Sequence, residues 1–346
     1  MSSKTKVLAI LLVLTFVIGL AGCGGGKGAA PAEQKSWAPQ KQVTFVAVSG
    51  AGGGLDMVAR TMSKIFDQKK IVTQPMMVEN KPGGGQVTGT VAFANQSAKD
   101  DHKLLIASTP FILNYIKKDG NSPIGPDQIY PVGMVQADYG VVVVRTESKY
   151  QTLKELMDAA KANPAAITFV GGGAPGTWDF LNVIQVARKA GVDIKAVKYN
   201  PYDGGGEALT ALLGGHGEAM TSDVSSIKQY VQAGKVRVLG VSAPERMAAD
   251  EVMKNIPTYK EQGFDVVTAN WRGIFAGKDI PEPAKKYWGD KVAELTKTQE
   301  WKDELKKQGV VDIYKDPKAF YDHIKSEQAV YTEIYKELGM AAADKK

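Results

Sequence analysis

Short apolar runs alternate with amphipathic helical patterns along most of the chain. The run 43–48 (VTFVAV) has the length of a buried strand, and the apolar residues after it recur at helical spacing as far as Phe66. The same succession returns at 76–96 and at 167–187, each time with a glycine-rich turn between the strand and the helix. Because a second series of strands and helices begins near Thr152, the pattern predicts an α/β protein with two lobes.

Four glycine-rich turns stand between a predicted strand and a predicted helix, at 49–54, 83–85, 171–176 and 204–206. In open α/β sheets such turns gather at the carboxyl ends of the strands, where ligands bind. Each helix start offers free N–H groups and about half a positive charge, which suits a carboxylate with several charges. For a single loop, a tight turn without a ligand is the alternative, but four loops together favour a binding site. Hydroxyl groups at the same strand ends add donors: Ser49, Ser108, Thr109, Thr177, Tyr199 and Ser222.

The glycine loops lack the motifs of nucleotide cofactors. Gly50 and Gly52 are followed by Leu55 where a dinucleotide fingerprint needs its third glycine, and no loop closes with Gly-Lys-Ser/Thr. The three histidines have no partner at metal-ligand spacing in the sequence, which also lacks a G-x-S-x-G motif. We therefore expect no cofactor, no metal and no catalytic residue.

Two aspartates, Asp56 and Asp179, lie in the first turns of helices that follow glycine loops. As caps they satisfy the helix dipole themselves. As ligand contacts they need a cation, a water or a ligand hydroxyl between their carboxylates and an anion. Arg60 lies four residues after Asp56, a spacing that predicts an ion pair on the surface of the helix.

The charge balance gives little sign of a nucleic-acid partner, and we expect none. Of the 346 residues, 43 are basic and 37 acidic, the net charge is +6, and the lysines are scattered along the chain. Arg145, which closes a strand, and Arg272 are the arginines most open to a ligand role, and we include Arg272 in the site. Trp271 beside it forms either a wall of the cleft or ordinary packing at the edge of the core, and we favour the latter.

The N-terminus has the pattern of a secretory leader. Two lysines precede an apolar run at 7–21, which is shorter than the about 20 residues of a membrane-spanning helix and has the length of a signal-peptide core. The sequence LAGC at 20–23 resembles a bacterial lipobox, and Cys23 is the sole cysteine. We expect a signal peptide at 1–22, a lipid on Cys23 and a flexible tether at 23–40. A plain secretory signal with an incidental cysteine is the alternative.

Several segments together resemble one known family, the Bug-type substrate-binding receptors of tripartite tricarboxylate transporters. The resemblance covers roughly 43–321, and GGGEALTALLGG and ANWRGIF within it are similar to the tricarboxylate-receptor branch. The segments that carry it are SGAGGGLDMVAR, VENKPGGGQVTGTVAFA, ITFVGGGAPGTWDF, GGGEALTALLGGHGEAMTSD, QAGKVRVLGVSAPER, IPTYKEQGFDV and ANWRGIFAG.

The resemblance implies a two-lobed fold of the periplasmic-binding-protein type, with a mixed sheet in each lobe and the ligand sealed between them. The first lobe comprises 41–143 and 268–346, the second comprises 144–267, and the hinge lies near Val144 and Thr268. Carried over residue by residue, the family's ligand contacts fall on Gly52, Gly53, Gly54, Asp56, Gly83, Gly84, Gly85, Gly172, Gly173, Thr177, Asp179, Gly204, Gly205 and Ser222.

The function implied is that of a monomeric receptor outside the cytoplasm, tethered to a bacterial membrane by lipid. It captures a small di- or tricarboxylate of the citrate type and presents its closed form to one large and one small integral membrane subunit. Two other functions remain open at this point. One is an extracytoplasmic hydrolase acting on a carboxylated substrate in the same cleft, and the other is a receptor that signals to a sensor kinase.

Overall fold

The computed structural model describes residues 37–343. The predicted signal peptide, the acceptor Cys23 and most of the predicted tether lie outside these residues. Within 37–343, none of the helices combines the length and the apolar character needed to cross a bilayer.

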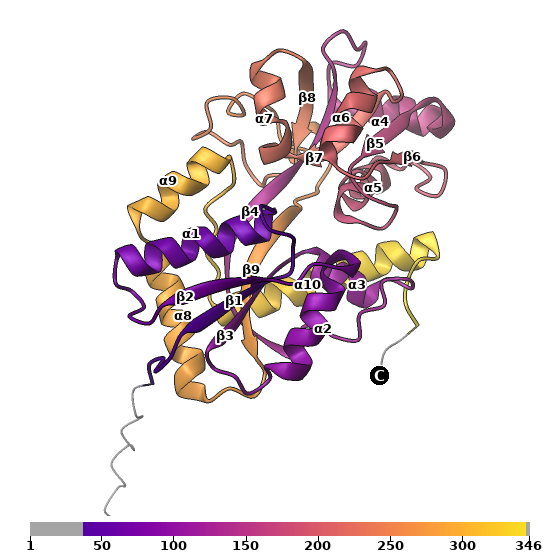
Figure 1. The fold of residues 1–346 in the computed structure, drawn as a ribbon. Helices are drawn as coiled ribbons and strands as arrows, with labels where there is room; N and C mark the ends of the chain where they lie inside the picture. Colours follow the sequence, from indigo (N-terminus) through magenta and orange to yellow (C-terminus); the bar gives the residue numbers. More distant parts are fainter. Residues whose placement is uncertain (1–36, 344–346) are drawn as a thin grey trace, which may run out of the picture. The chain divides into compact units, whose positions relative to one another are not determined.

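The strands of the described residues form one mixed sheet in the order β2-β1-β3-β9-β4-β7-β5-β6, with β8 paired to β4 (Figure 1). β1 pairs in parallel with β2 and β3, whereas β9 runs antiparallel between β3 and β4. The predicted α/β fold with mixed strand pairing is thus confirmed. The strands are β1 (Val43–Ala47), β2 (Met76–Asn80), β3 (Lys103–Ser108), β4 (Ile129–Arg145), β5 (Thr168–Gly171), β6 (Lys198–Pro201), β7 (Ala219–Asp223), β8 (Val236–Val241) and β9 (Ala269–Gly277).

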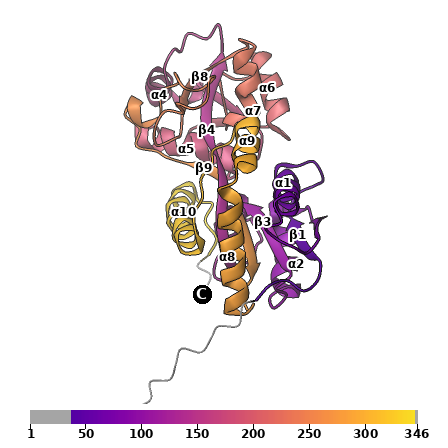
Figure 2. The same ribbon diagram turned by 90° about the vertical axis from the view of Figure 1, so that its left-hand side faces the viewer.

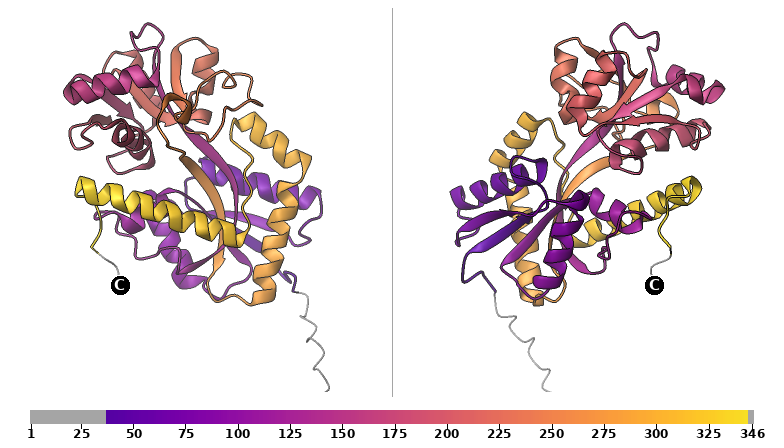
Figure 3. Two further views of the ribbon diagram at one scale, coloured as in Figure 1. Left: turned by 180° about the vertical axis from the view of Figure 1, so that it is seen from behind. Right: turned by 45° about the vertical axis from the view of Figure 1, so that its right-hand side comes forward.

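Helices cover both faces of the sheet (Figure 2), and those of the C-terminal segment return to elements formed early in the chain. α8 packs against β4, α9 against α1, and α10 against β4 and α3 (Figure 3). The α-helices are α1 (Gly54–Gln68), α2 (Val87–Gln96), α3 (Pro110–Ile116), α4 (Leu153–Ala162), α5 (Trp178–Ala190), α6 (Gly205–Leu213), α7 (Val224–Gln232), α8 (Glu282–Thr296), α9 (Gln299–Gln308) and α10 (Pro317–Leu338). Short 3₁₀ turns occur at η1 (Gly84–Gln86), η2 (Pro164–Ala166) and η3 (Lys260–Gln262).

The long strand β4 connects the two halves of the sheet. It pairs with β9 as far as Tyr139 and with β7 and β8 from Gly140 and Val141 onward. Its last part, 140–145 (GVVVVR), has the unbroken apolar pattern of a buried strand, whereas Gln136 and Asp138 interrupt that pattern in the part before it. The change of partner at Tyr139–Gly140 comes before the expected hinge at Val144. The division of the chain into the two predicted lobes stays a prediction.

A serine hydroxyl joins the segments that pass between the two halves. The backbone N–H of Gly140 donates to Ser242 Oγ at 2.7 Å, and that hydroxyl donates to the carbonyl of Thr268 at 2.5 Å. Ser242 is fully buried, so these bonds form away from water. The Thr268 hydroxyl also lies 3.0 Å from the Tyr331 hydroxyl of α10. These hydrogen bonds hold β4, the segment at Ser242 and the segment just before β9 together, and they connect them to α10.

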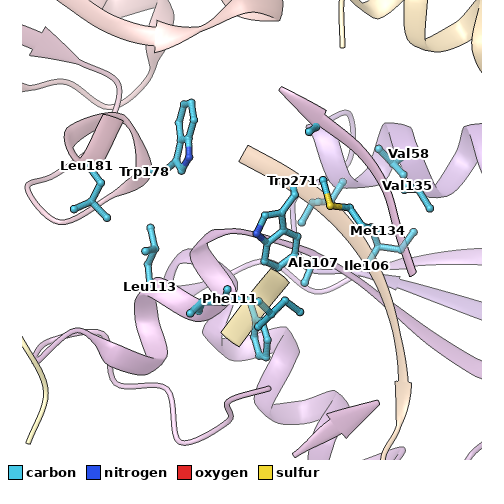
Figure 4. Close-up of a cluster of buried hydrophobic side chains, with 14 of the residues drawn as sticks. Val58, Ile106, Ala107, Phe111, Leu113, Met134, Val135, Trp178, Leu181 and Trp271 are labelled. Carbon is cyan, nitrogen blue, oxygen red and sulfur yellow. The ribbon is translucent and has the colours of Figure 1, made fainter. Parts of the chain in front are cut away.

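Trp271 belongs to the hydrophobic core beneath the sheet. It is fully buried, and its ring packs edge-on against Phe320 at a centroid distance of 5.2 Å. Figure 4 shows Trp271 and Phe111 within one cluster of buried side chains. The interpretation of Trp271 as a packing residue is confirmed, but the side chain lies inside the core and not at its edge. Because side chains alternate along β9, the next residue, Arg272, faces the other side of the sheet.

Candidate functional site

The first glycine loop leaves the start of α1 uncovered. Gly52 has a φ of 78°, a left-handed conformation that glycine adopts without strain. Among residues 37–343, the neighbour that a Cβ added to Gly54 would meet within 4 Å is the Arg272 guanidinium, at 3.8 Å. Backbone N–H groups at the start of α1 therefore adjoin an arginine side chain.

Asp56 fixes the shape of this loop from inside. Its Oδ2 accepts the N–H of Gly52 and the Nε of Arg60, both at 2.9 Å, and its Oδ1 accepts Asn80 Nδ2 at 2.9 Å. The side-chain hydrogen bond from Arg60 is the largest cause that lowers the Asp56 pKa to about 2. The predicted pair with Arg60 is present, and Asp56 itself is buried. With both oxygens engaged, the carboxylate positions the loop; a direct ligand contact by Asp56 stays a prediction.

The second glycine loop is held to β3 by a residue that the sequence analysis did not select. Gly83, Gly84 and Gly85 all have positive φ angles, and Gln86 continues them with a φ of 86°. Gln86 Nε2 donates to Ser108 Oγ at 2.6 Å, and the Ser108 N–H donates to Gln86 Oε1 at 3.1 Å. A polar side chain closing a run of glycines was the available sequence signal for Gln86.

These two loops, the end of β3 and Arg272 line one cavity of about 290 Å³. Of the predicted site residues, Ser49, Gly54, Gly83, Gly85, Ser108 and Arg272 are in its wall, together with Val48, Leu55, Pro82 and Gln86.

The remaining predicted residues of this half lie just behind the cavity wall. Gly52, Gly53 and Gly84 belong to the same two loops. Thr109 is fully buried, and its hydroxyl accepts the Trp271 N–H at 3.2 Å and lies 3.4 Å from the Ala269 carbonyl. Thr109 therefore ties α3 to β9.

Arg272 is the charged group of this cavity. Its Nη1 donates to the carbonyl of Asn270 at 2.7 Å. Within residues 37–343, no carboxylate lies within 4.0 Å of its guanidinium, unlike Arg60, which pairs with Asp56. A cation in a cavity wall that no acidic side chain neutralises suits an anionic ligand.

The loops of the other half of the sheet also meet each other. A Cβ on Gly172 would lie 2.6 Å from the Gly205 nitrogen and 2.8 Å from the Gly204 carbonyl carbon, so only glycine fits at 172. Tyr199 donates its hydroxyl to the Gly173 carbonyl at 2.9 Å. By contrast, none of the described residues places an atom within 4 Å of a Cβ on Gly204 or Gly205, so the start of α6 faces open space.

Thr177 and Ser222 have different surroundings in this half. The Thr177 hydroxyl donates to the Ala174 carbonyl at 2.8 Å and closes the third glycine loop. Ser222 is buried in β7, where it pairs with Val141 of β4. The cavity at Arg272 includes none of these residues of the second half, so closure of the two halves around a common ligand stays a prediction.

Three carboxyl groups gather where β4, β7 and α5 meet. Asp179 accepts the Gly172 N–H at 3.0 Å, and its pKa is raised to about 7, first by burial and then by the charge of Asp223. Burial, followed by the same Asp223 charge, raises the pKa of Asp138 well above its usual range. The charge of Arg272 opposes this shift at Asp138. The sequence analysis missed Asp138 and Asp223; a charged residue inside an otherwise apolar strand was the signal for Asp138.

Comparison with known proteins agrees with this architecture. The family model described as the tripartite tricarboxylate transporter family receptor matches residues 58–340. The UPF0065 protein in the gbd 5′ region of Cupriavidus necator is 29% identical over 92% of this chain and 94% of its own length. Protein BugT of Bordetella pertussis is 25% identical over 80% of each chain.

Solved structures show the same fold. A TctC solute binding protein from Polaromonas is 26% identical, with a TM-score of 0.73 over 87% of this chain and 99% of its own. Two neighbours from Rhodopseudomonas palustris are each 22% identical. MatC, with bound malate, has a TM-score of 0.67 over 86% and 99% of the two chains, and a protein with adipate has 0.71 over 88% and 99%.

Fold and geometry together define an extracytoplasmic solute-binding protein of the periplasmic type. The family match covers most of the chain and makes the assignment specific. The chain belongs to the tripartite tricarboxylate transporter receptor family. The predicted family and the prediction of a receptor in place of an enzyme are confirmed, and the hydrolase alternative is not favoured.

Proposed function

We propose that this receptor captures a small di- or tricarboxylate, citrate-like in its charge, and delivers it to the membrane subunits of a tripartite transporter. The observation that supports it most directly is Arg272, whose guanidinium stands beside the open helix start at Gly54 without a carboxylate partner among the described residues. The cation, the helix dipole and the glycine N–H groups all favour negative charge at one place.

The proposed capture step uses both halves of the site. One carboxylate binds to Arg272 and the first two glycine loops, and the other end of the ligand meets the loops around Gly172 and Gly205. Closure follows only as far as the ligand binds the closed form more tightly than the open one. Neighbours of the same fold hold malate and adipate, which supports a carboxylate ligand for this chain as well.

Thermal unfolding with citrate, malate, succinate and adipate tests this function. A ligand present at about 100 times its Kd stabilises the folded state by about 2.7 kcal/mol, which gives a clear rise in Tm. Arg272→Gln is expected to abolish the rise, whereas Arg246→Gln, which removes an exposed cation paired with Glu261, is expected to keep it. If no carboxylate raises the Tm of the unmodified protein, the proposal fails.

The membrane attachment and the partner are part of the same proposal. We propose lipid on Cys23, a monomeric receptor, and one large and one small integral subunit as its partners. Mass spectrometry of the purified N-terminus measures the lipid directly, with Cys23→Ser as the unmodified reference. Ligand-dependent co-purification with the integral subunits tests the partner; retention of a sensor kinase in their place would contradict it.

A further inference from the structure

Three polar side chains lie along one face of α10 at intervals of four residues: Glu327, Tyr331 and Tyr335. Residues at this spacing stand one above another on a helix, and the eight residues from first to last span about 12 Å. Glu327 accepts the indole N–H of Trp271 in β9 at 2.7 Å, and Tyr331 meets the segment just before β9. The Tyr335 hydroxyl donates to the carbonyl of Gly176, in the third glycine loop, at 2.6 Å. One helix face therefore connects β9, the segment before it and the third glycine loop.

α10 is fixed to the first half of the sheet and its helices at both ends. Near its start, Phe320 is fully buried and packs against Trp271, the neighbour of Arg272 in β9. Just after its end, the Lys118 N–H donates to the Met340 carbonyl at 2.8 Å, which ties the chain to the segment that follows α3. A helix held at both ends in this way keeps a fixed position relative to Arg272.

The third glycine loop packs directly against the end of this helix. A Cβ on Gly176, whose φ is 82°, would lie 2.7 Å from Met340 Cε and 2.8 Å from Lys117 Cδ. Tyr335 is fully buried, and burial raises its pKa further above its ordinary value of 10.0, so its hydroxyl remains a donor to the loop. The loop belongs to the second half of the sheet, whereas α10 belongs to the first.

This contact lies away from the place where the chain passes between the halves, in β4 and in the segment before β9. A hinge of that kind by itself permits rotation of one half against the other. The bond between Tyr335 and Gly176 is one helical turn further along α10 than Tyr331. Beside it, Arg188 of α5 forms an ion pair with Glu337 of α10 at 2.7 Å. Because contacts at a distance from a hinge fix the angle about it, the third glycine loop stands at a set distance from the cavity in the first half.

We propose that Tyr335 is a positioning residue for the ligand and that α10 determines the ligand length that the receptor accepts. Tyr335 holds the third glycine loop, and α10 keeps this loop at a set distance from Arg272. A dicarboxylate bound to Arg272 at one end reaches the loop with its other end only when its carbon chain matches that distance, because hydrogen bonds weaken steeply outside their normal geometry. The inference rests on the proposed receptor function and adds to it a selection by length.

Linear dicarboxylates test this on the unmodified full chain. Malonate, succinate, glutarate, adipate and pimelate differ by one CH₂ group at a time. Isothermal titration is expected to show one member binding at least about fivefold more tightly than its neighbours in the series. If the protein binds citrate alone, or binds the dicarboxylates without distinguishing their lengths, the inference is wrong while the receptor function stands. If neither the series nor citrate binds, the receptor function fails as well.

A variant locates the preference. Tyr335→Phe removes the hydroxyl at nearly constant volume, so the preferred dicarboxylate is expected to lose about fivefold in affinity and its neighbours less, which lowers the preference for one length. Tyr321→Phe is the matched control on the same helix. The Tyr321 hydroxyl donates to Asp127, in the first half, at 2.5 Å, and its loss is expected to leave the preference unchanged. An equal loss of affinity at every length in Tyr335→Phe, or no loss, contradicts the assignment.

A second variant keeps the test decisive if Tyr335→Phe does not fold. Met340 is only partly buried, so Met340→Ala is expected to fold. It removes the side chain that packs beside Gly176 and is expected to lower the preference for one length in the same direction. Thermal unfolding without ligand measures the stability of each variant separately. An unchanged length preference in Met340→Ala would show that the contacts at the end of α10 do not position the loop.

Discussion

Gln86 and Ser108, which are 22 residues apart, hold each other by two hydrogen bonds at the wall of the cavity. The amide of Gln86 fits both the hydroxyl and the backbone N–H of Ser108, although its own backbone has the left-handed φ of 86°. A residue with a strained backbone conformation persists at a binding loop when interactions with the surrounding structure hold it there, as these two hydrogen bonds hold Gln86. This pair fixes the distance between the second glycine loop and the end of β3.

Gln86→Gly is expected to lower ligand affinity while leaving the free energy of unfolding nearly unchanged. The variant loses two hydrogen bonds of about 1 kcal/mol each but relieves a left-handed strain of about 1–2 kcal/mol, so its free energy of unfolding changes by less than about 1 kcal/mol. Ligand affinity falls because the loop is no longer held. Lys70→Gly, at another residue with positive φ, is the control and leaves binding unchanged. Denaturant unfolding and titration measure the two effects, and an unchanged affinity in Gln86→Gly would contradict the role of the pair.

Asp56→Asn is expected to destabilise the protein at neutral pH by about 2 kcal/mol or more, since it removes charge-assisted bonds to Gly52 and Arg60. The pKa of Asp56 is lowered to about 2 in the folded state, from 3.8. Its contribution is therefore present above about pH 4 and is lost as the pH falls toward 2. Urea unfolding of both proteins from pH 2.5 to 7 checks this, and a pH-independent difference between them would disprove it.

Two neighbouring glycines at the start of α6 test the predicted ligand contacts. In the part of the chain that the structure describes, no atom lies within 4 Å of a Cβ placed on Gly205 or Gly206. Alanine at each position is therefore expected to stabilise α6 by up to about 1 kcal/mol. Gly205→Ala is nevertheless expected to weaken ligand binding, because Gly205 is a predicted contact, whereas Gly206→Ala is expected to bind normally. Melting curves with and without ligand compare the variants. Equal affinities would remove Gly205 from the site.

Glu327→Gln is expected to stabilise the protein at alkaline pH. Glu327 accepts the Trp271 indole N–H at 2.7 Å, and burial raises its pKa to about 8. An acid whose pKa is raised on folding stabilises at low pH, and that contribution is lost as the pH rises toward 8. The other groups facing Glu327 are His323, 3.6 Å away, together with Lys315 and Tyr331.

The pH range for this measurement follows from His323. Burial lowers the pKa of His323 from 6.5 to about 4, which makes stability rise with pH between these values and opposes the slope from Glu327. The comparison is therefore made from pH 6.5 to 9, where His323 no longer titrates. The variant is expected to lack the fall in unfolding free energy that the unmodified protein shows there. Parallel curves for the two proteins would refute the assignment.

Ser242→Ala tests the connection at the crossing strands. It leaves the buried Gly140 N–H and Thr268 carbonyl without their hydroxyl partner, at a cost of about 1–3 kcal/mol. Ser63→Ala is the matched control, because the Ser63 hydroxyl only donates to a helix carbonyl, that of Ala59, and its loss is expected to cost less than about 0.5 kcal/mol. Chemical denaturation measures both. Equal losses of unfolding free energy in the two variants would show that the Ser242 hydroxyl contributes no more to stability than the hydroxyl of Ser63.

Local sequence patterns were sufficient to predict the α/β class, the glycine turns at helix starts, the Asp56–Arg60 pair and the family. Each of these depends on residues close together in the chain, where strand and helix periods decide which side chains meet. The segments that carry the family resemblance are likewise local runs of residues. The unbroken strand β4 was missed for the same reason, since Gln136 and Asp138 disrupt the local apolar pattern that the prediction used.

Which of these parts lie together depends on strand pairing between distant parts of the chain. Gln86 reaches Ser108 because β3 lies beside the second loop, and Arg272 reaches the start of α1 because β9 pairs with β3. Strand register likewise set Asp138 and Asp223 on one face. Register is a property of strands far apart in the chain, and a shift by one residue turns every side chain to the opposite face. The site therefore depends on pairings that local sequence does not encode.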